Sequence, residues 1–212
     1  MNNSLKILRL TKADKSSFVT LMSQAFAQDP LFLHVFGNSL HNNEASSRVE
    51  VFVSFMFDKS FLLNEELWGV FENERLLGTY IVETPSSSKF QKVLGGLLVL
   101  GKLFSLLIQL PFKTLGLLNT YMRVTRASAP LYPHHYLIMI GVTPEAQGEG
   151  IGKALLHHLL ANVRADSESQ GVALDTENKG NVDLYRRFGF ELNKEISFDE
   201  LPVYCMNYKK EC

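Results

Sequence analysis

Three glycines at alternate positions constrain the fold of this chain more than any other feature of its sequence. They occupy residues 147–152, Gln-Gly-Glu-Gly-Ile-Gly, between an apolar run, His135–Val142, and an amphipathic run that starts at Lys153. At the start of a helix the backbone N–H groups have no intrahelical partner and carry partial positive charge. A tight turn would need only one or two glycines with positive φ. The order strand, glycine loop and helix therefore predicts an anion site, most often for phosphate.

The spacing of the glycines excludes two common phosphate-binding loops. The dinucleotide fingerprint G-x-G-x-x-G would need a glycine at Lys153, and the P-loop G-x-x-x-x-G-K-[ST] fails because Ala154 follows Lys153. The string instead matches Q/R-x-x-G-x-G/A, the pyrophosphate loop of the GNAT superfamily of acyl-CoA N-acetyltransferases. The chain therefore resembles that superfamily.

The resemblance extends over about residues 136–190. A β-prone run, Gly171–Thr176, follows the amphipathic run, and residues 181–190 fit N-x-x-x-Y-x-x-x-G-F. More narrowly, the chain is similar to the puromycin N-acetyltransferase-like branch, which shares the approach to the glycine loop and an acidic residue with Thr on the next strand. Two departures concern the substrate side: Asp175 stands where the branch usually has Glu, and His135 stands where an aromatic residue is common.

Composition limits the classes of function. The chain has 212 residues, 46% of them hydrophobic and 20% charged, with a net charge of −1. These values fit one globular domain with a substantial core, and there is no basic surplus to indicate nucleic acid. The two cysteines, Cys205 and Cys212, form neither a disulfide framework nor a metal-ligand spacing. We therefore expect a cytoplasmic protein without a signal peptide.

One apolar segment, residues 93–110, is long enough to raise the question of a bilayer span. Lys102 lies at its centre, where a charge costs about 2.5–3.5 kcal/mol on insertion scales, and Pro111 ends it. We therefore expect one or two buried helices, with membrane anchoring through 93–110 as the alternative. The relatives that the resemblance indicates carry a long apolar insert at this point.

The expected fold class is α/β (α+β): a mixed, mostly antiparallel central sheet with helices on both faces and, from the resemblance, a splayed central strand pair. We expect one acyl-CoA N-acyltransferase domain over 1–212, with an apolar helical insert at about 86–133. The periodicity predicts strands at 5–10, 67–71, 77–82, 137–142, 171–176, 191–198 and 203–208. It predicts helices at 16–27, 43–61, 153–164 and 181–188.

The resemblance implies acetyl-CoA as co-substrate and no metal. The pantetheine arm would pair with the backbone of the central strand, and the pyrophosphate would lie on the N–H groups of the glycine loop. The implied acyl-CoA residues are Ile140, Gly141, Val142, Gln147, Gly148, Glu149, Gly150, Ile151, Gly152, Lys153, Asn181 and Tyr185. Asn181 is also a natural helix N-cap.

Acyl transfer to an amine requires a neutral amine and a stabilised thiolate. Tyr185 lies where the superfamily has its general acid. Since a phenol has a pKa near 10 and a thiol near 8.5, a strong hydrogen bond to the thiolate is favoured over full proton transfer. Asp175, Glu177, His134 and His135 are the candidates for the base, and the choice among them stays open.

The resemblance implies transfer of an acetyl group from acetyl-CoA to the amine of a small molecule, by direct attack in a ternary complex. The acceptor site would be formed by residues 28–36 and 89–129, which are rich in Phe and Leu. Alternatives are an acyl-CoA-binding sensor, an O-acyltransferase or the membrane-anchored protein. We expect neither nucleic-acid binding nor stable membrane insertion, and a homodimer is left open.

Overall fold

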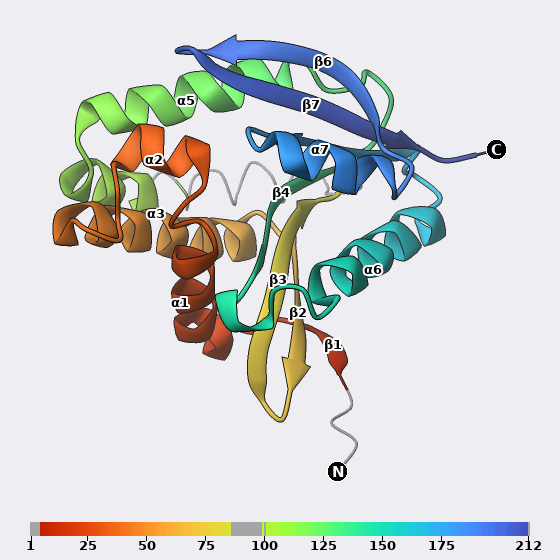
Figure 1. Ribbon diagram of the computed structural model, residues 1–212, viewed down its shortest axis with the longest axis horizontal. Helices are drawn as coiled ribbons and strands as arrows, with labels where there is room; N and C mark the ends of the chain where they lie inside the picture. Colours follow the sequence, from red (N-terminus) through yellow and green to blue (C-terminus); the bar gives the residue numbers. More distant parts are fainter. Residues whose placement is uncertain (1–4, 86–98, 100, 212) are drawn as a thin grey trace.

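Seven strands form one continuous sheet in the computed structural model, which describes residues 5–85, 99 and 101–211 (Figure 1). The sheet order is β1-β2-β3-β4-β5-β7-β6, and every neighbouring pair is antiparallel except β4 and β5. This arrangement confirms the expected mixed, mostly antiparallel sheet. The strands are β1 (Lys6–Arg9), β2 (Glu66–Glu72), β3 (Arg75–Glu83), β4 (His135–Val142), β5 (Gly171–Thr176), β6 (Glu191–Phe198) and β7 (Leu201–Lys209).

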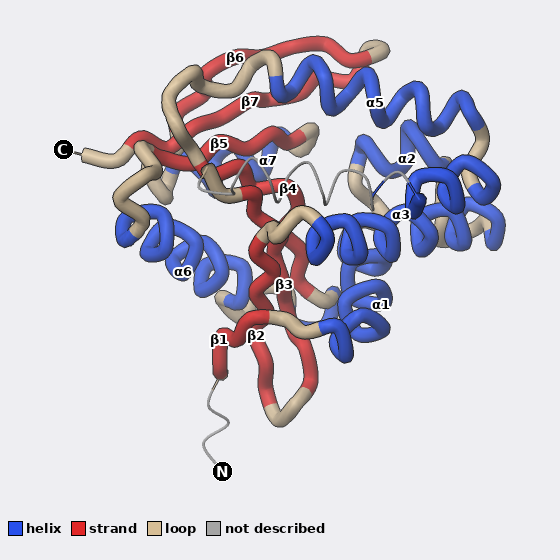
Figure 2. Tube along the Cα trace, turned by 180° about the vertical axis from the view of Figure 1, so that it is seen from behind, coloured by secondary structure: helices blue, strands red, loops and turns tan. Residues whose placement is uncertain are grey.

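Helices cover both faces of this sheet, and the sheet twists so strongly that β6 and β7 run across the direction of β2 and β3 (Figures 1 and 2). The helices are α1 (Lys15–Ala25), α2 (Pro30–Phe36), α3 (Asn43–Leu62), α5 (Phe112–Arg126), α6 (Ile151–Ala165) and α7 (Lys179–Arg186), with residues 101–109 also helical. Two short 3-10 turns, Lys12–Asp14 and Pro144–Ala146, precede α1 and the glycine loop.

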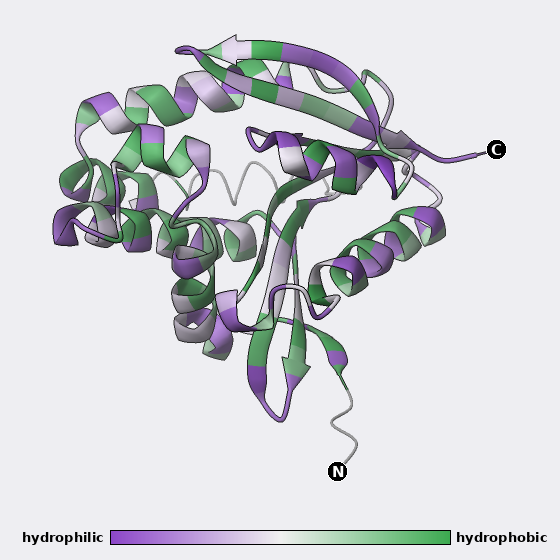
Figure 3. Cartoon of the chain, viewed as in Figure 1, coloured by the Kyte–Doolittle hydropathy of each residue, from purple (hydrophilic) through white to green (hydrophobic). Residues whose placement is uncertain are grey.

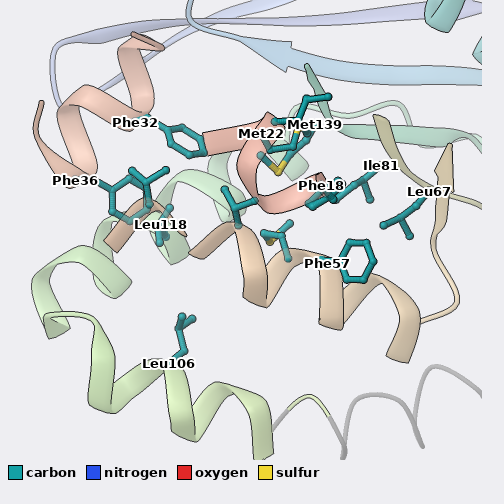
Figure 4. Close-up of a cluster of buried hydrophobic side chains, with 14 of the residues drawn as sticks. Phe18, Met22, Phe32, Phe36, Phe57, Leu67, Ile81, Leu106, Leu118 and Met139 are labelled. Carbon is teal, nitrogen blue, oxygen red and sulfur yellow. The ribbon is translucent and has the colours of Figure 1, made fainter. Parts of the chain in front are cut away.

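The apolar stripes of the helices explain which face each one covers. Phe18 and Met22 of α1 pack with Phe57 of α3, Ile81 and Met139 in one buried cluster (Figure 4). On the opposite face, α6 buries the predicted residues Leu155, Leu156, Leu159, Leu160 and Val163. The amphipathic pattern therefore predicted α6 correctly.

The β2–β3 hairpin forms where the sequence predicts it. Asn73 and Glu74 have positive φ values of 46° and 67°, which suit the tight turns that match strand twist. Glu72 pairs with Arg75 across the turn, and the tip is hydrophilic (Figure 3).

Two helix starts differ from the sequence-based expectation. The sequence analysis predicts no helix between residues 27 and 43, but Asp29 caps the helix α2 there by accepting from the N–H groups of Leu31 and Phe32 at 3.0 and 3.2 Å. Pro30 fits because the first helical position needs no N–H donor. In the last helix the cap is Asn178, which accepts from Gly180 N–H at 2.9 Å, so α7 starts earlier than predicted and Asn181 is not its cap.

The described part of the insert is helical at 101–109 and 112–126, although only one side of the first of these helices is buried. Residues 86–98, with part of the apolar segment, lie outside the described residues. Leu106 and Leu110 are 4% and 3% exposed, whereas Phe104 and Ile108 are 66% and 74% exposed. The expectation of buried helices was therefore only half right. In the portion of the chain that the structure describes, no helix combines the length and hydropathy needed to cross a membrane.

Two glycines let helices approach the β3–β4 pair closely from opposite faces. A Cβ at Gly141 would lie 2.7 Å from Met22 Sδ and 3.0 Å from Ala25 Cβ of α1. A Cβ at Gly78 would lie 2.7 Å from Ile151 Cγ2, at the start of α6. Gly78 pairs with Val142 and Thr79 with Gly141, so both close contacts occur at the same end of β4, where the chain enters the glycine loop.

We expect Gly141→Ala to destabilise the fold by about 1–3 kcal/mol, because the added methyl group overpacks the contact with α1. Gly116→Ala is the matched control, since nothing lies within 4 Å of its Cβ position in the helix α5. This second change should stabilise by about 0.5–1 kcal/mol through helix propensity. Urea denaturation of both variants measures the difference, and equal stabilities would refute the close-packing argument.

Candidate active site

The parallel contact between β4 and β5 is only two residue pairs long. His135 pairs with Val172 and Tyr136 with Ala173, after which β4 continues along β3 and β5 continues along β7. From Leu137 onward, no strand of the described residues pairs with the edge of β4 that faces β5. Backbone N–H and C=O groups need hydrogen-bond partners, so this edge is suited to an extended ligand.

A β-bulge in β4 accompanies the separation of the strands. Leu137 pairs with Val82 and Met139 with Ile81, which leaves Ile138 as the extra residue. Residues two apart in a regular strand share a face, but Leu137 belongs to the cluster under α6 and Met139 to the cluster under α1. The bulge therefore changes the alternation of faces where the gap opens, as bulges do when they bend a strand.

The glycine loop joins the end of β4 to α6. Gly148 and Gly150 both have φ of 86°, in the left-handed region that favours glycine. The first intrahelical bond runs from Ala154 N–H to Gly150 O at 2.9 Å. The N–H groups before it lie at the positive end of the helix dipole, which fits a pyrophosphate group.

The other loop residues contribute in different ways. Gly152 lies in ordinary helix conformation, and a Cβ there would meet Val142 Cγ2 at an unstrained 3.7 Å. Gln147 donates its amide to Val142 O at 3.4 Å, which ties the loop to the strand. Glu149 and Lys153 are exposed. The structure thus brings the predicted residues Ile140, Gly141, Val142, Gln147, Gly148, Glu149, Gly150, Ile151, Gly152 and Lys153 into one continuous strand, loop and helix start.

Carboxylates and phenols gather where β5 ends. The Tyr121 hydroxyl of α5 contacts carboxylate oxygens of both Asp175 and Glu177. The Tyr136 hydroxyl of β4 donates to the other oxygen of Asp175. Two other elements, α5 and β4, therefore hold Asp175, and α5 also holds Glu177. The sequence singled out both carboxyl groups as candidates for the base.

Burial raises the pKa of all three carboxyl groups in this region. The pKa of Glu177 rises to about 8, because of burial first and the nearby charge of Asp29 second. The pKa of Asp29 rises to about 6, again mainly through burial, although two backbone N–H groups oppose the shift. Burial also raises the pKa of Asp175, against the lowering effect of hydrogen bonds from Tyr121 and Tyr136. A proton on Glu177 at neutral pH follows from these shifts.

Tyr185 approaches the same carboxyl groups from α7. It is 5% exposed, and its ring packs on Phe190 with centroids 5.6 Å apart. Burial and the charges of Asp175 and Glu177 raise its pKa, so the phenol keeps its proton. Within the described residues, nothing accepts a hydrogen bond from its hydroxyl. The phenol is thus a hydrogen-bond donor whose acceptor is not among the described residues.

The structure does not bring the histidines into this cluster. The His135 side chain is 3% exposed, contacts Ser169 Oγ through Nδ1 at 2.9 Å, and has Asp166 Oδ2 3.6 Å from Nε2. Burial lowers its pKa, which favours a neutral, structural imidazole. His134 bonds the carbonyl of Tyr132 at 2.7 Å. Both lie at the closed end of the β4–β5 gap.

Asn181 and Arg126 complete the surroundings of the site. Asn181 donates to Thr176 Oγ1 at 3.3 Å, beside the end of β5. The Arg126 guanidinium lies 3.6 Å from the centroid of the Tyr136 ring and 2.8 Å from Glu83. The sequence analysis did not select Asp29, Tyr121, Arg126 and Tyr136, although Asp29-Pro30 carries the signal of a helix cap.

A separate groove lies between α1, α3 and residues 101–109, and none of the residues assigned to the candidate active site lines it. In the described ranges, 5–85, 99 and 101–211, no cluster of three or more His, Cys, Asp and Glu side chains is arranged to hold a metal ion.

Comparison with known proteins shows what the part of the chain around this site is similar to. Residues 118–192 match the family model of the acetyltransferase (GNAT) domain. A 67-residue stretch is 37% identical to mycothiol acetyltransferase from Mycolicibacterium gilvum, over 28% of this chain and 22% of that protein. The chain thus spans only about a fifth of the length of that curated relative in the match.

Solved structures of low sequence identity share the whole fold. A Corynebacterium glutamicum protein described as histone acetyltransferase HPA2 and related acetyltransferase superposes with a TM-score of 0.68 at 22% identity, over 99% of this chain and 98% of that one. The PaiA N-acetyltransferase from Thermoplasma acidophilum, solved with coenzyme A, has a TM-score of 0.59 at 12% identity, over 98% and 99%. The resemblance to the GNAT superfamily is confirmed, and the narrower puromycin-type resemblance stays a prediction.

Glu177→Gln should flatten the pH dependence of stability. Folded Glu177 titrates near 8 and an unfolded Glu near 4.3, so the folded state binds the extra proton between these values. Stability should then fall as pH rises through this window, by at most about 1.4 kcal/mol per pH unit from this group. In the Gln variant the free energy of unfolding should depend less on pH, because this group no longer titrates. The variant should therefore be more stable than the wild type at about pH 8.

Urea denaturation at several pH values from about 5 to 9 measures this effect. Glu191→Gln, which changes an exposed glutamate of β6, is the control and should keep the wild-type slope. Parallel wild-type and Glu177→Gln profiles would show that Glu177 holds no such proton.

Proposed function

Because this chain carries a GNAT acetyltransferase domain and has the GNAT fold, we propose that it transfers an acetyl group from acetyl-CoA to the amine of a small molecule. The reaction would be a direct attack in a ternary complex. One observation carries the proposal: the β4–β5 gap has the glycine loop on one side and the Asp175, Glu177 and Tyr185 groups on the other. We further propose a single domain over 1–212, with an insert at about 86–133, acting in the cytoplasm.

Acetyl-CoA binding would rely mostly on backbone groups. The N–H groups of residues 148 and 150–153 would hold the pyrophosphate, since they precede Ala154, whose N–H makes the first bond within α6. The free edge of β4 at Ile140 and Val142 would pair with the pantetheine arm. This geometry would place the thioester in the gap, beside the end of β5.

The attacking amine needs a base whose pKa lies near the working pH. Glu177, with a pKa of about 8, meets this condition, and Asp175 contributes negative charge beside it. Glu177 is 9% exposed, so a water molecule would carry the proton between the amine and its carboxylate. Asp29 adds a third carboxyl group, so the site favours an acceptor that arrives as an ammonium ion.

Tyr185 would stabilise the leaving thiolate by donating a hydrogen bond. Its raised pKa makes complete proton transfer to a thiolate more unfavourable than for a free phenol. A fixed donor aimed at developing charge does not require that transfer. Asn181, which bonds Thr176 at the end of β5, would help to place α7 and thereby Tyr185.

Thiol release from acetyl-CoA with a panel of amines tests the function. We expect turnover with amines, and Tyr185→Phe should lower kcat and kcat/KM together by about 10²–10³-fold, as loss of one preorganised donor does. The ring still packs on Phe190, so the fold should survive. Turnover only with alcohols would indicate an O-acyltransferase, and acetyl-CoA binding without any turnover would indicate a sensor.

A pair of glycine variants separates binding from chemistry. Gly150→Ala forces a side chain into positive φ, so it should weaken acetyl-CoA binding more than it lowers kcat at saturation. Gly116→Ala is the control, because it lies in α5, outside the glycine loop, and nothing lies within 4 Å of its Cβ position. Equal acetyl-CoA affinities for the two variants would argue against the proposed pyrophosphate site.

A further inference from the structure

One hydroxyl group on the insert helix α5 joins the two carboxyl groups at the end of β5. Tyr121 Oη lies within hydrogen-bonding distance of both Asp175 Oδ2 and Glu177 Oε1. Tyr136 donates its own proton to Asp175 Oδ1. The result is a hydrogen-bonded chain that runs from Glu177 through Tyr121 and Asp175 to Tyr136.

The number of protons in this chain follows from the chemistry of its members. A phenolic hydroxyl has one proton to donate and lone pairs to accept, whereas an ionised carboxylate only accepts. Tyr121 can therefore donate to only one of its two carboxyl partners. The second contact is a hydrogen bond only if that carboxyl group carries a proton and donates it to Tyr121 Oη. The pair of carboxyl groups thus holds one proton.

The surroundings decide which carboxyl group holds that proton. Asp175 accepts from two phenols and lies in the field of Arg126, which lowers its pKa. Glu177 has the charge of Asp29 as its strongest unfavourable neighbour and no cation among the causes of its shift. Asp175 is therefore the ionised member and Glu177 the protonated one. The other titratable or charged groups around the pair are Asp29, Arg126 with its partner Glu83, Tyr136, Tyr185 and Cys205.

We propose that Tyr121 is a positioning residue that binds Asp175 and Glu177 into one unit with a single resident proton, and that the enzyme becomes active when this proton leaves. The inference rests on the proposed acetyl transfer. After the resident proton and the extra proton of the ammonium ion have gone to solvent, the unit accepts one proton from the neutral amine as the N–C bond forms and the C–S bond breaks, with the electron pair leaving on sulfur. The insert would thereby set the pH range of the reaction.

The role of Tyr121 predicts opposite effects for two substitutions. Without the Tyr121 hydroxyl, the second negative charge loses its shared donor, so the upper pKa of the pair should rise. Without the charge of Asp175, Glu177 should lose its proton more readily, so that pKa should fall. A shift of about one unit corresponds to about tenfold in the active fraction at pH 7.

The test is the pH profile of kcat/KM for the full chain with its best amine. The activity of the wild type should rise with pH through the pKa of the pair. Tyr121→Phe should move this limb to higher pH by about one unit and recover activity in alkaline solution. Asp175→Asn should move the rise in kcat/KM to lower pH, and Glu177→Gln should abolish this rise. The phenyl ring of the Phe variant retains the packing on Phe198, where the centroids are 5.4 Å apart.

Tyr208→Phe is the matched control, because its hydroxyl bonds Arg164 at 3.0 Å, apart from the carboxyl groups. The kcat/KM of this variant should rise with pH over the same range as that of the wild type. A loss in Tyr121→Phe that is equal at every pH, with no movement of the limb, would reduce Tyr121 to a structural residue and overturn the proposal.

A second readout keeps this proposal distinct from the acetyltransferase function. The stability of the fold should decrease with rising pH until the pair has lost its proton. The pH at which this decrease ends therefore measures the pKa of the pair without any turnover. Tyr121→Phe should move this end point to higher pH relative to the wild type and to Tyr208→Phe. If no amine is acetylated but the end point moves, the proposed function fails and the proton-holding pair stands. If the end point does not move, the pair proposal is overturned whatever the activity.

Discussion

The two-residue contact between β4 and β5 determines how the rest of the site is arranged. A sheet with full pairing here would satisfy the edge of β4 and leave no room for an extended ligand. The bulge at Ile138 separates the strands, and β3 and β7 then hold them apart. Gly78 and Gly141 allow α6 and α1 to pack tightly on both faces at the end of β4, so the glycine loop has a fixed position relative to the gap.

The polar groups beside this gap are costly for the fold and useful for chemistry. Buried carboxyl groups without cationic partners are destabilising when ionised, and they respond by keeping protons. Asp29, Asp175 and Glu177 all show raised pKa values, with burial as the first cause. Phenols from α5 and β4 satisfy part of their hydrogen-bonding capacity. Groups of this kind, with perturbed pKa values and specific partners, are typical of catalytic sites.

The sequence predicted the features that depend on local pattern. The glycine loop, the apolar stripe of α6, the β2–β3 hairpin and the strands β5 and β6 all follow from short motifs or periodicity. Contacts between distant segments do not follow from such patterns and were not predicted. Tyr121 meets Glu177 across 56 residues of chain, and no periodicity encodes that pairing. The helix α2 was missed because Asp29-Pro30 is typical of a helix break as well as of a helix start, and here it starts α2. Sequence alone also does not tell which residue of β4 borders Asp175: His135 contacts Ser169, whereas its neighbour Tyr136 contacts Asp175.

Amide hydrogen exchange with and without acetyl-CoA tests the central claim most directly, namely that the free edge of β4 and the glycine loop together form the acyl-CoA site. The account predicts slower exchange at residues 137–142 and 148–153 when acetyl-CoA is present, and unchanged exchange in the β2–β3 hairpin, which lies outside the site. Unchanged exchange at both segments, or protection confined to the groove between α1, α3 and residues 101–109, would contradict it.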